Sequence, residues 1–134
     1  MFRLLILAIP LVFLAAPAAA AGGWDKVDCK NPQDQSSMNY CADQDYRAAD
    51  KKLNAVYQKV MAALDDDGYK TKLKAAERAW MTFRDTECTF ETAENEGGSI
   101  HPLVYSGCET RLTDERTKAL QSYLACFKDA DTCK

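Results

Sequence analysis

The sequence predicts an all-α protein: a small, disulfide-stapled, antiparallel three-helix bundle with a long loop between its second and third helices. Two observations predict the helices. Apolar residues recur every three or four positions in three segments, and no segment shows the sustained apolar–polar alternation of a β-strand. A third observation predicts the disulfides, because an even number of cysteines, six, follows an apolar N-terminal segment.

The first predicted helix runs from Ser37 to Asp66, with Ser36 or Ser37 as its N-cap. Its apolar stripe consists of Ala42, Tyr46, Ala49, Leu53, Tyr57, Val60 and Leu64. The run Asp65-Asp66-Asp67-Gly68 ends this helix and turns the chain. That run lacks the alternating oxygen ligands and the distal Glu of a calcium loop, so we interpret it as a solvated helix end.

The second predicted helix extends from about Tyr69 to Asn95, where Gly97-Gly98 stops it. One face carries Leu73, Ala76, Trp80 and Phe83, and we interpret Trp80 and the aromatic residues near it as core.

The third predicted helix begins near Cys108, because Ser106 and Glu109 have the spacing of a capping box. Its apolar face consists of Leu112, Ala119, Leu120, Tyr123 and Phe127. These bounds leave Glu96–Gly107 as a long loop.

The six cysteines should divide between the two ends of this bundle. Short turns make successive helices antiparallel, which places Cys29, Cys41, Cys88 and Cys108 at one end. Cys126 follows Cys108 by 18 residues, a helical distance of about 27 Å, so only Cys133 can reach it. Three of the fifteen connectivities remain, and among them we favour Cys29–Cys41, Cys88–Cys108 and Cys126–Cys133. With no Cys-x-x-Cys and a single histidine, the sequence predicts no metal site.

Residues 1–21 have the three regions of a secretory signal. Arg3 precedes the apolar run from Leu4 to Ala16, and small residues before Ala21 fit a cleavage site. We expect residues 22–134 to form one exported helical domain, periplasmic or secreted. No second apolar stretch follows and no cysteine lies at the cleavage point, so we expect no stable membrane or lipid anchor after cleavage.

The charge of the chain disfavours nucleic acid as a partner. The chain has 17 basic and 20 acidic residues, and loss of Arg3 with the signal would leave a net charge of −4. Nucleic-acid binding requires clustered Lys and Arg, whereas an acidic exported protein is steered toward basic partners.

Four polar residues lie beside the predicted apolar stripes: Asp50, Asn54, Arg84 and Arg111. A buried carboxylate and guanidinium require each other, so we predict an ion pair of Asp50 with Arg84 or Arg111 that fixes helix register. The alternative is a polar binding site between helices.

The segment Glu96–Gly107 holds the single histidine, a proline, two adjacent glycines and four apolar residues. It is either a binding loop, pre-organised by a disulfide at its base, or a structural connection that caps the bundle. As a binding loop it would use Gly98, Ser99, His101 and Tyr105. No nucleophile–base arrangement accompanies the histidine, and an even cysteine count leaves no thiol for catalysis, so we predict a protein that is not an enzyme and needs no cofactor.

The chain resembles the N-terminal domain of LprI-type lysozyme inhibitors over roughly Cys29 to Leu124. Three runs carry the resemblance: Cys41-Ala42 … Asp50 … Leu53-Asn54 … Tyr57, Ala79-Trp80 … Phe83-Arg84-Asp85 … Glu87-Cys88, and Gly98-Ser99 … Cys108 … Arg111. The resemblance implies a small, helical, disulfide-bonded, exported bacterial protein.

It also implies a function, inhibition of a lysozyme by steric and electrostatic blockade of the enzyme's cleft. A basic lysozyme and an acidic inhibitor attract each other, and Ser99 or His101 could donate to the two carboxylates of the lysozyme cleft. The alternative is a non-enzymatic envelope module that binds another envelope component.

Overall fold

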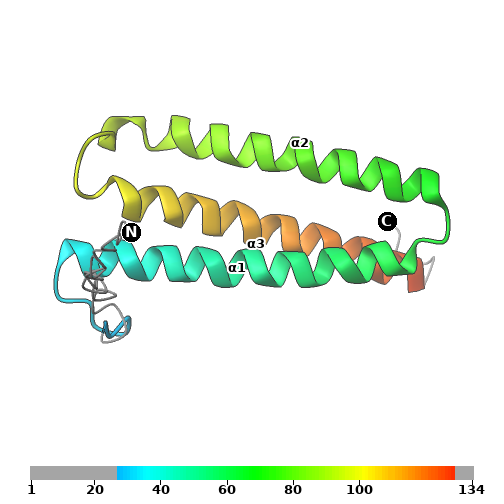
Figure 1. Ribbon diagram of the computed structural model, residues 1–134, viewed down its shortest axis with the longest axis horizontal. Helices are drawn as coiled ribbons and strands as arrows, with labels where there is room; N and C mark the ends of the chain where they lie inside the picture. The colour runs from blue at the N-terminus through cyan, green and yellow to red at the C-terminus, as the bar shows by residue number, and fades with distance from the viewer. Residues whose placement is uncertain (1–26, 129–134) are drawn as a thin grey trace, which may run out of the picture.

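The computed structural model describes residues 27–128, and within them the chain is all-α, as predicted. Three long helices, α1 (Gln35–Ala63), α2 (Asp67–Glu91) and α3 (His101–Lys128), are joined by short connections, one of which contains the 3₁₀-helix η2 (Ala93–Asn95). The three helices run antiparallel in sequence order, and α1 and α3 lie side by side while α2 stands further off (Figure 1). The predicted signal, residues 1–21, lies outside the described residues.

The helix α1 begins two residues before the predicted start. The backbone N–H of Ser37 donates to the Asp34 carboxylate at 2.7 Å, so Asp34 is the N-cap. The predictions of Ser36 and Ser37 as caps are therefore wrong. This hydrogen bond lowers the pKa of Asp34, because it stabilises the ionised form.

The acidic run between α1 and α2 both ends one helix and starts the next. The Asp66 carboxylate accepts from the N–H of Tyr69 at 2.8 Å and caps α2. The helix then ends at Glu91, four residues before the predicted Asn95, and the chain tightens into η2. Gly97, with φ of 77°, adopts the left-handed conformation that turns the chain toward α3.

The helix α3 begins at His101 and not near Cys108, so the predicted loop over residues 96–107 is too long. Pro102 lies in the first turn of α3, where its fixed φ suits the helix and its missing N–H costs no hydrogen bond. Ser106 and Glu109 are interior helical residues and form no capping box. The connection that remains after η2 is the five-residue segment 96–100.

The apolar core lies between α1 and α3. Leu53, Val56 and Val60 of α1 pack with Leu120 of α3. Tyr57, Leu73, Trp80 and Leu124 pack around this cluster and are half-buried. Every residue of the predicted α1 stripe is buried or half-buried, so that prediction is confirmed.

The predicted apolar faces of α2 and of the end of α3 are partly wrong. Ala76 is exposed, and Phe83 is 50% exposed. Phe90, Tyr123 and Phe127 are also exposed, so these aromatic residues are not core. Only Arg84 and Cys88 of α2 are buried, because this helix attaches to the α1–α3 pair largely through polar contacts.

Ion pairs and one disulfide hold α2 to α3. Arg116 donates to Glu77 with its Nε (2.9 Å) and Nη2 atoms, and both side chains are largely buried. Arg111 donates from Nη2 to both carboxylate oxygens of Glu91 at 2.7 Å. These pairs lie at two levels along the helices and set the register of α2 on α3.

Two disulfides, Cys29–Cys41 and Cys88–Cys108, match the predicted pairing. The third predicted pair depends on Cys133, which lies outside the described residues. Structural disulfides indicate that the protein folds in an oxidising compartment. Within residues 27–128, no helix is long and apolar enough to cross a membrane.

Candidate functional site

The end of the bundle that contains the α2–α3 connection is the first candidate site. We call residues 88–108 the stapled end, because the disulfide Cys88–Cys108 closes this segment at its base. Cys88 is fully buried and packs with Cys108, Leu112 and Tyr105. The disulfide therefore fixes the last turn of α2 against α3, and the segment 96–100 projects from a rigid base.

The projecting segment is exposed along its length and is tied at both sides. The N–H of Gly98 donates to the carbonyl of Asn95 (2.9 Å), and the N–H of His101 donates to the carbonyl of Gly98 (3.2 Å). The Asn39 side-chain amide of α1 donates to the Ser99 carbonyl (2.9 Å). Of the four predicted binding residues, Gly98 and Ser99 are thus at an exposed and ordered tip.

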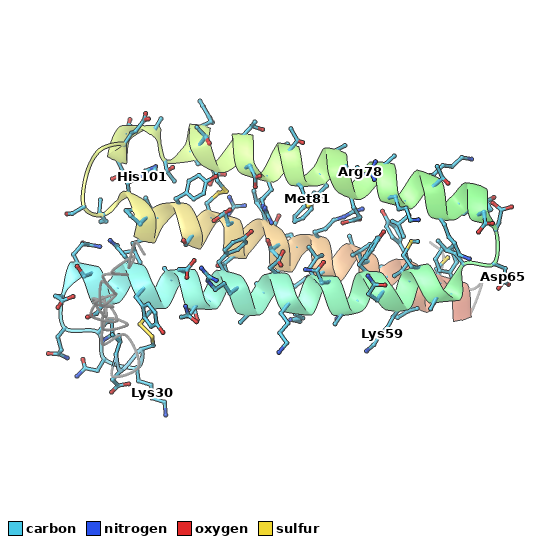
Figure 2. The ribbon with its side chains drawn as sticks, in the orientation of Figure 1. Lys30, Lys59, Asp65, Arg78, Met81 and His101 are labelled. Carbon is cyan, nitrogen blue, oxygen red and sulfur yellow. A yellow bond between two sulfur atoms is a disulfide. The ribbon has the colours of Figure 1, made fainter. Side chains whose placement is uncertain are left out.

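His101 and Tyr105 are placed differently from Gly98 and Ser99. The Nε2 atom of His101 lies 3.3 Å from the Oγ1 atom of buried Thr92, and its ring lies against that of Tyr105. The Tyr105 hydroxyl reaches the carbonyl of Asp85 at 3.5 Å. Both side chains are half-buried, and their contacts with Thr92 and with the carbonyl of Asp85 direct them away from the exposed tip. Figure 2 shows His101 at this end of the bundle.

The stapled end is acidic. Residues 88–108 contain no Lys or Arg but contain three acidic residues, Glu91, Glu94 and Glu96, of which Glu91 is paired with Arg111. Glu94 precedes the projecting segment, Glu96 begins it, and both are exposed. The whole chain has a net charge of only −3, so negative charge is concentrated at this end. This local charge favours basic partners here.

A buried arginine occupies the centre of the bundle and is the second notable feature. Arg84 is 7% exposed and donates to the Asp85 carboxylate at 2.9 and 2.7 Å. Its guanidinium also lies 3.9 Å from Asp50, and its carbon Cζ lies over the rings of Tyr46 and Trp80 at 5.2 and 5.3 Å. Burial is the largest single influence on the pKa of Arg84 and lowers it, but the Asp85 hydrogen bond and the charges of Tyr46, Asp85 and Glu109 together raise the pKa overall.

Sequence reasoning missed the role of Glu109 in this cluster. Burial raises the pKa of the Glu109 carboxyl, and the charge of Arg84 opposes the rise only in part. Glu109 lies one helical turn before Leu112 and Thr113, which are on the buried side of α3. This spacing is the sequence signal that indicates an inward position for Glu109.

The remaining predicted polar residues fall into two groups. Asn54 donates to the Asp50 carboxylate at 2.8 Å, and Asp50 is the acid that contacts Arg84. Arg111 lies elsewhere and pairs with Glu91 and Glu115, so the alternative Asp50–Arg111 pair is wrong. Asp50 is exposed on one side and does not bury a full ion pair.

The described residues contain no group of three or more His, Cys, Asp or Glu side chains arranged to hold a metal ion. The cysteines at residues 29, 41, 88 and 108 are all oxidised in disulfides. What this arrangement offers is a rigid, exposed and negatively charged surface, which is suited to binding another molecule.

Three comparisons with known proteins agree with this architecture. Residues 29–120 match the family model described as "Lysozyme inhibitor LprI". The uncharacterized protein R02472 of Rhizobium meliloti (strain 1021) is 38% identical over 125 residues, covering 84% of this chain and 90% of that protein. The uncharacterized protein YecT of Escherichia coli (strain K12) is 28% identical over 115 residues, covering 72% of this chain and 71% of that protein.

A solved structure also resembles this fold. The crystal structure of a DUF1311 family protein (pp0307) from Pseudomonas putida KT2440 superposes with a TM-score of 0.64 at 27% sequence identity. The match covers 69% of this chain and 95% of that chain. Since the family model spans most of the sequence, including both disulfides, α1, α2 and most of α3, the chain belongs to the LprI lysozyme inhibitor family.

Proposed function

We propose that this protein is an exported, non-enzymatic inhibitor that binds a basic lysozyme with its stapled end and blocks the enzyme's substrate cleft. The observation that carries the proposal is the acidic, disulfide-closed tip, in which exposed Glu94 and Glu96 directly precede exposed Gly98 and Ser99. Membership of the LprI family supports the choice of a lysozyme as partner.

Two physical properties of the tip suit it to this task. The surrounding carboxylates raise the rate of encounter with a positively charged enzyme. The disulfide and the Asn39–Ser99 hydrogen bond hold the segment 96–100 in place before binding, which lowers the entropy cost of ordering it in the complex.

Contacts within the lysozyme cleft would come from the smallest residues of the tip. The cleft of such an enzyme contains two carboxylates, so hydrogen-bond donors are needed where the tip enters. The Ser99 hydroxyl is exposed and can donate. Glu94 and Glu96 lie to the side, where they would face the basic surface around the cleft.

The test is an assay of cell-wall lysis by a basic lysozyme with the purified protein added. We expect inhibition that weakens as salt rises, because screening shortens the range of the attraction. The double variant Glu94→Gln/Glu96→Gln should weaken inhibition by about tenfold or more at low salt, through slower association.

The matched control is Asp65→Asn/Asp67→Asn, which changes the net charge equally at the opposite end of the bundle. Asp65 and Asp67 are exposed, and neither is the cap of α2. This control should inhibit like the wild type. An equal loss of inhibition in both double variants would refute a specific role for the tip. Absence of inhibition at micromolar protein would refute the proposal for that lysozyme and favour the envelope-module alternative.

A further inference from the structure

A cleft of about 390 Å³ opens between α1 and α2, in the part of the bundle where these two helices do not pack against each other. It lies along the middle of α1 and the first half of α2, at the level of Arg78 and Met81 in Figure 2. Its volume is in the range of sites that hold small molecules. It is separate from the stapled end, which begins at Cys88, seven residues beyond Met81, the last α2 residue of the cleft.

The floor and one side of the cleft are apolar. Leu53 is buried, and Tyr57 and Trp80 are half-buried, so each aromatic side chain keeps part of its surface open to the cleft. Met81 is 44% exposed and lines the cleft on the α2 side. Aromatic rings and a flexible thioether together bind apolar faces of varied shape.

Both carboxylates that line the cleft have an arginine nearby, but they differ in how closely it is held. Glu77 accepts hydrogen bonds from Arg116, whereas Asp50 lies 3.9 Å from Arg84, which is hydrogen-bonded to Asp85. Asn54 donates to Asp50, which fixes the orientation of both side chains. Asp50 and Asn54 therefore offer fixed oxygen acceptors, and Asp50 keeps part of its negative charge.

The cations of the cleft, in contrast, have no such compensation. Among the arginines of residues 27–128, Arg78 is the one without a carboxylate partner, since the other four all form ion pairs. Lys74 precedes Arg78 by one helical turn and likewise forms no ion pair with the described residues. Side chains four residues apart share one face of a helix, so two positive charges border the cleft in a protein of net charge −3.

From this combination we infer that the α1–α2 cleft binds a small carboxylate-bearing molecule that has an apolar face and hydroxyl or amide N–H donors. The carboxylate pairs with Arg78 and Lys74, the apolar face packs on Trp80 and Tyr57, and the donors reach Asp50 and Asn54. Two kinds of molecule have this chemistry: an acidic N-acetylated sugar and the free carboxyl end of a short peptide.

The experiment titrates the full chain with two matched pairs of probes and follows the Trp80 indole resonance by NMR. N-acetylmuramic acid is compared with N-acetylglucosamine, which has the same ring but no carboxylate. Acetyl-alanyl-alanine is compared with its C-terminal amide. We expect one carboxylated probe to shift the Trp80 signal saturably, and its uncharged partner to bind at least about tenfold more weakly. The pair that responds shows whether the cleft binds the acidic sugar or the carboxyl end of a peptide.

Two double variants complete the experiment. Lys74→Gln/Arg78→Gln should weaken binding by about tenfold or more, with an unchanged melting temperature because neither residue has an ion pair to lose. The control Lys51→Gln/Lys59→Gln removes equal charge from exposed positions of α1 outside the cleft, and Lys59 points away from α2 in Figure 2. The control should bind like the wild type.

Several results would overturn the inference. One is the absence of a saturable shift at Trp80 with all four probes up to about 10 mM. Another is equal binding of the charged and uncharged probes, and a third is equal loss in both double variants. Since the Lys74→Gln/Arg78→Gln variant leaves the acidic tip intact, its inhibition of lysozyme should not change, and failure of the cleft inference is thereby distinguished from failure of the proposed function.

Discussion

Replacement of Arg84 by Met tests whether the buried guanidinium organises the attachment of α2. Arg84 is one of the two buried residues of α2, and it contacts α1 through Asp50 and the Tyr46 ring. Methionine retains most of the apolar stem of the side chain and fills irregular space. The change therefore removes the charge and its hydrogen bonds while keeping most of the packing.

The expected loss can be estimated from the contacts. The two hydrogen bonds to Asp85, whose side chain is 52% exposed, contribute about 1 kcal/mol after allowance for solvent screening. The rings of Tyr46 and Trp80 at 5.2 and 5.3 Å contribute about 0.5–1 kcal/mol each. Loss of the positive charge beside buried Glu109 adds to this, for a total of about 3 kcal/mol, or about 15 °C in Tm for a domain of this size.

The assay is urea and thermal unfolding followed by circular dichroism at pH 7, with Lys52→Met as the control. Lys52 forms an exposed ion pair with Asp114 at 3.8 Å, and such pairs are worth less than about 1 kcal/mol. If Arg84→Met costs no more than this control, the cluster around Arg84 is not an organising contact and the reasoning is refuted. The reasoning also predicts that Arg84→Met lowers the free energy of unfolding by less when Glu109 is replaced by Gln, since the two side chains interact.

Two further predictions concern neighbouring features. Glu109→Gln should stabilise the protein at pH 7. The pKa of Glu109 in the folded state is raised above the ordinary 4.5, so its contribution to wild-type stability falls as pH rises from about 4.5 through the raised pKa. The advantage of Gln should therefore vanish below pH 4.5, and a pH-independent difference in unfolding free energy would contradict this. Cys88→Ala/Cys108→Ala should lower the free energy of unfolding by about 3 kcal/mol through lost loop closure, and it should weaken lysozyme inhibition. Cys29→Ala/Cys41→Ala should lower Tm but inhibit normally. Unchanged inhibition in both variants would show that the Cys88–Cys108 disulfide is not needed at the tip.

The features that the sequence predicted well follow from strong local periodicity and from simple geometry. The α1 stripe is correct because α1 packs closely on α3, so burial and the three-to-four spacing coincide along the helix. Antiparallel helices bring Cys29, Cys41, Cys88 and Cys108 to one end, which leaves three connectivities, and the observed pairing is the one in which each bridge closes a local segment.

The failures have equally specific reasons. The helical spacing of α2 predicts a core position for its aromatic residues, yet Phe83 and Phe90 are exposed, because α2 packs largely with polar residues that a hydrophobic pattern does not mark. The capping-box spacing of Ser106 and Glu109 predicts that α3 begins near Cys108, but the helix begins at His101, with Pro102 in its first turn. The cleft could not be located at all, because it depends on how far α2 stands from α1.

The polar attachment of α2 explains why both proposed sites involve this helix. A third helix held by a continuous apolar seam would close the space between α1 and α2, whereas attachment through Glu77–Arg116, Glu91–Arg111 and one disulfide leaves that space open. Charge is divided along the same stretch of chain, with the cations Lys74 and Arg78 beside the cleft and the carboxylates Glu94 and Glu96 at the tip beyond the end of α2. An anionic small molecule and a basic protein would therefore bind to different surfaces without competing, and each can be abolished by substitutions that leave the other intact.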